Sequence, residues 1–87
     1  VSVSSNVTLT NERIHFVDTT AARSLALPAA SANLYLVVKD VSGSASTNNI
    51  TLETPGAETI DGVDPYVINS DYASTTVVSD GTNYFIV

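Results

Sequence analysis

The chain has no cysteine, no methionine and no tryptophan, and few of its 87 residues carry a charge. Without cysteine, no disulfide can stabilise the fold and no cysteine-based metal site can form. Charged residues make up 14% of the chain, whereas soluble domains average about 25%. Because its first residue is not Met, we expect the chain to be a processed product, or a fragment or C-terminal domain of a longer protein.

Cations are the scarcest charged groups. Arg13, Arg23 and Lys39 stand against nine acids, which gives a net charge of −6. Proteins that bind nucleic acid need several clustered cations, so this function is excluded, and attraction to an anionic membrane surface is equally disfavoured. No apolar run approaches the roughly 18 residues of a membrane span, so we expect no membrane insertion. Nor does the chain open with a positively charged segment followed by an apolar one, so we expect no signal peptide in it.

Residues that favour β-structure are abundant instead. Val, Ile and Thr account for 28 of the 87 residues, and these β-branched types fit a pleated sheet better than a helix. No segment has apolar residues at helical spacing for long enough to predict a helix. The length predicts a single β-domain over residues 1–87.

The apolar content exceeds what so small a domain can bury. Hydrophobic residues make up 44% of the chain and the mean hydropathy is +0.20. A domain of this size buries only about 60–65% of its unfolded surface. We therefore expect part of the apolar surface to be covered by other chains.

Alternating apolar and polar residues, separated by turn residues, predict about eight short strands. We expect an all-β fold, a small antiparallel β-sandwich or roll. The segment 34–41 is largely apolar on both faces and is predicted to be a central strand covered on both sides. In 13–18, Ile14 and Phe16 are predicted to face inward and His15 outward. The predicted strands are 6–10, 13–18, 24–27, 34–41, 50–54, 66–69, 74–79 and 83–87.

The glycines and prolines fall between these runs or at their ends, as a sheet requires. Asp80-Gly81 is the strongest hairpin signal. Either a two-residue turn or a longer loop over 80–83 fits, and the choice reverses which residues face inward. The segment 43–49 has the composition of a linker. The residues predicted for the core or for an interface are Leu25, Leu27, Leu34, Leu36, Val38, Ile50, Leu52, Ile68, Val77 and Ile86.

Few residues suggest catalysis. His15 is the only histidine, and a Ser-His-Asp system would need it. The chain has no Gly-x-Ser-x-Gly motif, however, and a polar residue on the outer face of a strand explains His15 equally well. Glu53, Glu58 and Asp61 offer carboxylates for glycoside hydrolysis, but nothing in their spacing pairs them. We assign no catalytic residue and expect no enzyme activity.

Candidate ligand sites are equally weak. Asp61, Asp64 and Asp71 carry oxygen ligands of the kind that calcium prefers, but the first two are explained as turn formers. We assign no metal and no cofactor. Tyr66 and Tyr72 could stack on a sugar, and equally fit a sheet, so the ligand-binding residues stay unknown. The glycosylation patterns beginning at Asn6 and Asn49 are interpreted as chance matches.

An ordered set of turn motifs carries a resemblance that covers nearly the whole chain after Asn11. It resembles small β-domains of tailed-bacteriophage virion proteins, chiefly tail fibres and tailspikes. Tyr84 departs from the pattern, which more often has tryptophan there. The segments that carry the resemblance are 13–20, 26–31, 38–51, 58–62 and 79–87.

The resemblance implies a homotrimeric, non-enzymatic part of the virion, located on the phage tail or capsid surface, and transfers no catalytic residue. The leading hypothesis is a distal domain of a tail fibre or tailspike that contributes to trimer stability and host attachment. Its partners would be other virion proteins and a host cell-surface glycan or outer-membrane component. One alternative is a capsid decoration protein that stabilises the phage head. Another is part of a depolymerising hydrolase, which the residues do not favour.

Overall fold

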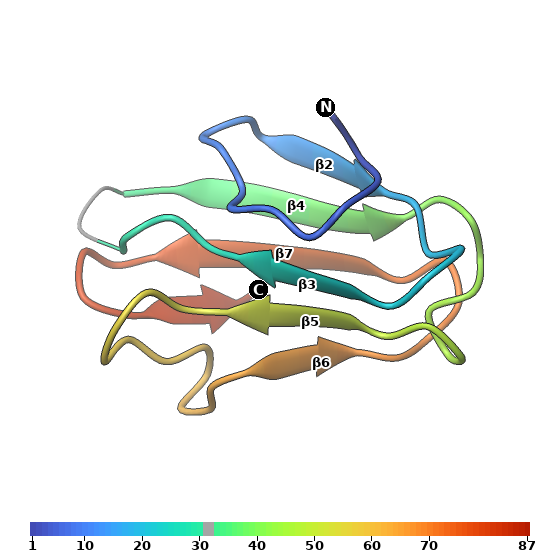
Figure 1. The fold of residues 1–87 in the computed structure, drawn as a ribbon. Coiled ribbons are helices and arrows are strands. Elements are labelled where there is room, and N and C mark those ends of the chain that lie inside the picture. Colours follow the sequence, from blue (N-terminus) through green and yellow to red (C-terminus); the bar gives the residue numbers. More distant parts are fainter. Residues whose placement is uncertain (31–32) are drawn as a thin grey trace.

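The computed structural model describes residues 1–30 and 33–87, and these residues form an all-β fold without a helix. Figure 1 shows the arrangement of the strands. Ser31, the last residue of one motif named above, lies outside the described residues. The strands are β1 (Ser2–Val3), β2 (Ile14–Val17), β3 (Arg23–Ala26), β4 (Tyr35–Asp40), β5 (Ile50–Glu53), β6 (Tyr66–Ile68), β7 (Ser74–Ser79) and β8 (Tyr84–Ile86).

The strands form two mixed sheets, not the purely antiparallel arrangement predicted from the sequence. One sheet has the order β1-β2-β4-β7-β8 and the other the order β3-β5-β6. The pairs β1–β2, β2–β4 and β3–β5 are parallel. For β2–β4 and β3–β5 the reason is that the chain alternates between sheets from β2 to β5, so each strand returns to its own sheet in the direction of its predecessor. Short turn signals do not distinguish such a crossing from a hairpin.

Side chains from both sheets share one core. Eight of the ten residues predicted for it are buried, and Leu34 and Ile86 are partly buried against it. The Cα radius of gyration is 11.7 Å, close to the roughly 12 Å of a folded chain of this length. Buried residues that the sequence analysis did not single out are Val3, Leu9, Val17, Ala30, Ala45, Ile60 and Tyr84.

The predicted facing of β2 is wrong. Ile14 and Phe16 face outward and are 40% and 43% exposed, whereas His15 is 1% exposed and faces the interior with Val17. Because side chains alternate along a strand, a shift of one residue exchanges the two faces. Both faces of β2 carry a large side chain at each position, so alternation alone could not orient this strand.

The hairpin between β7 and β8 has the longer of the two predicted loops. Ser79 pairs with Tyr84, which leaves residues 80–83 in the loop. The Asp80 carboxylate accepts hydrogen bonds from the amides of Thr82 and Asn83, both at 2.9 Å. Gly81 has φ of +96°, which favours a residue without a Cβ atom. This register turns Tyr84 into the core.

The first ten residues connect one edge of each sheet. Ser2 and Val3 pair with Phe16 and Val17 of β2, and Thr8 then forms an isolated parallel bridge with Ala26 at the end of β3. The predicted strand over 6–10 is thus only this bridge. Figure 1 shows the dark-blue N-terminal segment passing from β2 toward β3. It closes one side of the core.

Candidate interaction surface

The outward side of the five-stranded sheet carries apolar side chains on four strands, β2, β4, β7 and β8, and its polar outward positions on these strands are Lys39, Ser74 and Thr76. Ile14 lies opposite Val37 in the register of β2 and β4, Tyr35 opposite Val78, and Val78 opposite Phe85. Residues opposite one another on neighbouring strands have their side chains in contact range, so these form a continuous band. We call this band the outer apolar face; its residues are Ile14, Phe16, Tyr35, Val37, Val78 and Phe85.

Few charged residues lie on or beside this face, and those that do, Lys39 and Arg13, are positively charged. Lys39, opposite Phe16, is the only charged residue at the outward positions of β2, β4, β7 and β8. At one end, the Arg13 guanidinium carbon lies 4.5 Å from the centre of the Tyr35 ring, a cation–π distance. No carboxylate stands at these positions. The prediction that β4 is central is confirmed, but Tyr35 is 46% exposed, so within one copy β4 is not covered on both sides.

The outward side of the three-stranded sheet differs in character. Ser24, Thr51 and Val67 lie side by side there, and Ala26 pairs with Glu53. Val67, which is 42% exposed, is the only large exposed apolar residue among the described strand positions of this sheet. The domain therefore has one apolar and one largely polar sheet face.

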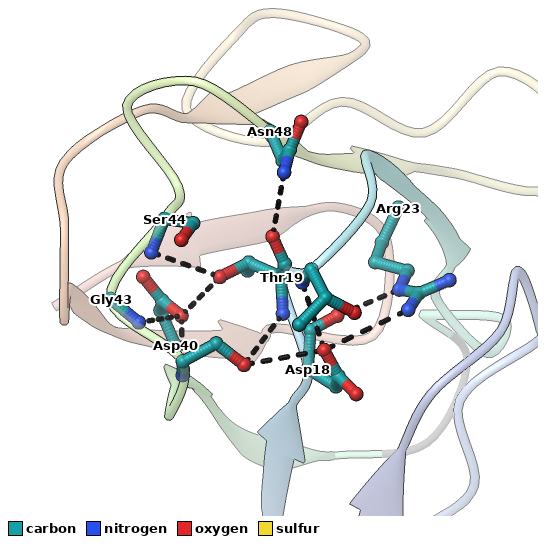
Figure 2. A network of polar contacts seen from close by, with 9 residues as sticks. Asp18, Thr19, Arg23, Asp40, Gly43, Ser44 and Asn48 are labelled. Atoms are coloured by element: carbon teal, nitrogen blue, oxygen red, sulfur yellow. Dashed lines mark hydrogen bonds and ion pairs between the residues drawn. The ribbon is translucent and has the colours of Figure 1, made fainter.

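A polar network joins the ends of β2 and β4 to the loops beside them (Figure 2). At its centre, the fully buried carboxylate of Asp40 accepts five hydrogen bonds. One comes from the Thr19 hydroxyl at 2.7 Å. The other donors are the amides of Ser42, Gly43, Ala45 and Tyr72, at 2.9 to 3.1 Å.

Thr19 extends this network in three directions. Its hydroxyl accepts from the Ser44 amide, its own amide donates to the Ser42 hydroxyl, and its carbonyl accepts from Asn48, at 3.1, 3.1 and 2.9 Å. The segment 43–49, predicted to resemble a linker, is thus held by defined contacts, and Ala45 within it is buried. Asp18 continues the network to Arg23, whose side chain lies 3.8 Å from its carboxylate.

The network fixes the protonation state of Asp40. Burial alone would raise the pKa of this carboxyl, but hydrogen bonds from Thr19 and from the amides of Tyr72, Gly43 and Ala45 outweigh burial and lower the pKa to about 2. The ionised form is the one that can accept five donors. The network is therefore a structural clamp on the loops, with Asp40 ionised at its centre.

The domain is expected to lose stability in acid. A pKa that is lower in the folded state contributes stability above pH 3.8, the unfolded value, and this contribution disappears as the pH falls through about 2. Asp18 and Asp80 also have lowered pKa values, held mainly by hydrogen bonds from Thr20 and from the Asn83 amide. Urea titrations between pH 5 and 2 measure the effect. The Asp40→Asn variant should lose less stability over this range than wild type, and an equal loss would contradict the assignment.

His15 is placed differently from its prediction. Neither ring nitrogen has a hydrogen-bond partner of normal geometry among the described residues. Burial lowers the pKa of His15 and the chain's first amine lowers it further, while the Val37 backbone and Glu12 act in the opposite direction. Since no serine or aspartate among the described residues hydrogen-bonds to the ring, the structure does not assemble a Ser-His-Asp arrangement around it.

The acidic candidates are dispersed. Asp61, Asp64 and Asp71 each accept a backbone amide from a different segment: Ile86, Thr54 and Ser46, respectively. Within 1–30 and 33–87, no three His, Cys, Asp or Glu side chains are grouped so that they could hold a metal ion. Of the carboxylates considered for glycoside hydrolysis, Glu58 accepts the Ala30 amide at 2.9 Å and Glu53 is exposed at the end of β5.

The remaining candidates have structural surroundings. Tyr66 packs against the core, whereas Tyr72 is exposed and its carbonyl accepts a hydrogen bond from Lys39. Asn6 is exposed and accepts the Ser24 amide, while the side-chain oxygen of Asn49 is buried. The described residues contain no helix that could cross a membrane.

The sequence analysis did not predict which side of the molecule would carry the exposed apolar residues. The composition indicated that part of the apolar surface would be uncovered. Ile14 and Phe16 belong to that surface, but the sequence analysis predicted that they face the core. The available signal was the largely apolar pattern of 34–41, which favours a cover on the outward side of β4. No protein-family model matches the sequence, and no curated protein is similar to it.

Proposed function

We propose that this chain is a non-enzymatic structural domain of a bacteriophage virion, a distal part of a tail fibre or tailspike that assembles as a homotrimer. The observation that carries the proposal is the outer apolar face. It supplies the uncovered apolar surface that the composition requires, on one side of the molecule. The family assignment itself derives from the turn motifs of the sequence.

Further copies of the same chain suit this face as partners. Single exposed apolar residues are ordinary, but a contiguous band across four strands is typical of an interaction site. Lys39, beside this face on β4, is the only charged residue at the outward positions of β2, β4, β7 and β8, so identical copies can approach without burying opposed carboxylates, although the chain carries a net charge of −6. In a closed ring each copy covers its neighbour. The two sheets, packed as a small sandwich or roll, would keep the face rigid.

The largely polar outward side of the three-stranded sheet is consistent with the proposed contact between the domain and the host surface. With the apolar faces turned toward the trimer interior, hydroxyl-bearing positions such as Ser24 and Thr51 would face the surroundings of the virion. There the domain would contribute to contact with a host glycan or an outer-membrane component. It would equally stabilise the trimer of the longer virion protein.

The oligomeric state tests the proposal. In sedimentation equilibrium at micromolar concentration, we expect a species of three times 9.1 kDa. The double variant Phe16→Asp/Phe85→Asp should dissociate to monomers, because each aromatic lost from an interface weakens association about tenfold or more. Val67→Asp is the matched control, since Val67 has similar exposure on the other sheet, and this variant should remain trimeric. A monomeric wild type, or dissociation of the control alone, would overturn the proposal.

A further inference from the structure

A cavity of about 420 Å³ opens at the end of the fold where the segment after β3, the loop after β5 and the loop between β7 and β8 come together (Figure 1). Its volume lies within the range of small-molecule sites. Two contacts hold these segments: the Tyr84 hydroxyl donates to the Pro28 carbonyl at 2.6 Å, and the Thr59 amide donates to the Asn83 side chain at 3.0 Å. The described residues that line the cavity are Ala29, Ala57, Glu58, Gly81, Thr82 and Asn83.

Glu58 and Asn83 each use one side-chain atom to hold the backbone and leave another unused. One Glu58 carboxylate oxygen accepts the Ala30 amide at 2.9 Å, and the Asn83 side-chain oxygen accepts the Thr59 amide. The second Glu58 oxygen and the Asn83 amide nitrogen have no hydrogen-bond partner among the described residues. Both residues are half-buried, and neither atom is among the buried side-chain atoms that lack a partner. Both atoms are therefore accessible from solvent.

The cavity combines an acceptor, a donor and apolar surface. The free Glu58 oxygen accepts hydrogen bonds and the Asn83 amide nitrogen donates them. The methyl groups of Ala29 and Ala57, both exposed, add apolar surface.

These groups select among classes of ligand. Glu58 is the only charged residue among the described residues of the lining, so an anion would be repelled. An ammonium group can only donate and would leave the Asn83 amide nitrogen unpaired. A pair of neighbouring hydroxyls satisfies both groups, because a hydroxyl can donate as well as accept.

We propose that this cavity binds a neutral sugar through two neighbouring hydroxyl groups. One hydroxyl donates to the free Glu58 oxygen and the other accepts from the Asn83 amide nitrogen, while Ala29 and Ala57 contact the C–H groups of the ring. The inference rests on the proposed function for the source of the sugar, a host glycan. The site itself lies within one copy of the chain.

An NMR titration of the ¹⁵N-labelled 87-residue chain tests the proposal. The probes are the methyl α-glycosides of glucose, galactose and mannose. The comparators are tetrahydropyran, which has the ring without hydroxyls, and ethylammonium, which can only donate. At least one glycoside should give saturable shifts confined to 28–30, 57–59 and 80–84, with a dissociation constant on the order of 1 mM for a ligand of this size.

Both comparators should bind at least about tenfold more weakly than that glycoside, because each lacks one or both of the hydrogen bonds. Absence of binding by all three glycosides, or equal binding of either comparator, would overturn the proposal.

Two variants of nearly unchanged shape test the two hydrogen bonds. Glu58→Gln keeps an oxygen for the Ala30 amide but replaces the free oxygen with a donor. Asn83→Asp keeps the oxygen for the Thr59 amide but replaces the donor with an acceptor. Each should weaken glycoside binding about tenfold, the loss expected for one hydrogen bond.

Glu53→Gln is the matched control, since Glu53 is exposed at the end of β5 and does not line the cavity. It should bind the glycoside as wild type does. Undiminished binding by either cavity variant contradicts the role of that residue and overturns the proposal. Thermal midpoints show whether each variant folds, and if one does not, the other and the comparators decide.

Sedimentation of the same samples separates this inference from the proposed function. A trimer that binds no glycoside overturns only the sugar site, whereas a monomer that binds one overturns only the trimeric assembly.

Discussion

Replacing Asp40 by alanine should destabilise the domain strongly, with an expected loss of about 3–5 kcal/mol. The substitution leaves the Thr19 hydroxyl and four loop amides without their acceptor. Since a small domain is stable by only about 5–15 kcal/mol, such a loss is a large share of the free energy of unfolding. Urea denaturation, followed by far-UV circular dichroism, measures the difference.

Two comparisons isolate the cause. Asp40→Asn keeps the size of the side chain but replaces one acceptor oxygen with a donor, so its loss should lie between those of wild type and Asp40→Ala. Asp80→Ala removes a carboxylate that also accepts two backbone amides, but in an exposed loop where water can replace it, and should cost far less. Equal losses for Asp40→Ala and Asp80→Ala would show that burial of the network is irrelevant.

Truncation of Tyr84 is the second substitution with a large expected effect. Tyr84 has no solvent-exposed surface, and its hydroxyl donates to the Pro28 carbonyl at 2.6 Å. Tyr84→Ala should cost about 3–5 kcal/mol, because it leaves a cavity in the shared core. Tyr84→Phe removes only the hydrogen bond and should cost about 1 kcal/mol.

Tyr72→Ala is the control, because it also removes a tyrosine ring, but one that is exposed instead of buried. The Tyr72 side chain is exposed, while its backbone amide still donates to Asp40 after the substitution. Chemical denaturation should therefore rank the losses as Tyr84→Ala, then Tyr84→Phe, with Tyr72→Ala no larger than Tyr84→Phe. A loss for Tyr72→Ala as large as that for Tyr84→Ala would mean that the exposed ring, not the core, dominates.

The strands were largely predictable because the turn residues delimit them. The segment 50–54 alternates between a loop with Gly43 and a turn at Pro55, and 74–79 ends at the turn Asp80-Gly81; the structure places β5 and β7 there. Two features were not predictable from local patterns. The facing of β2 depends on the N-terminal segment that covers His15, and the parallel pairs depend on which sheet each strand joins. Both are set by contacts between residues far apart in the chain.

The contacts of the polar network could not be predicted from the sequence motifs. Asp18, Thr19 and the segment 40–48 belong to motifs that carried the resemblance, but nothing in their spacing indicates that they meet. The amide of Tyr72 completes the same cluster from a part of the chain where no motif was recognised. The residues of these motifs that enter the network make contacts that hold the loops of the fold.

Because the chain alternates between the two sheets, the five-stranded sheet is completed late during synthesis of the chain. On the ribosome, β4 emerges with one neighbour, β2, and its other neighbour, β7, is synthesised only after β5 and β6 have been added. The wider sheet thus cannot close around its middle strand until nearly the entire chain has left the exit tunnel. Because distant pairings form slowly, the nascent chain would present its apolar strands for an extended time, and dilution or a chaperone should raise the yield of folded product.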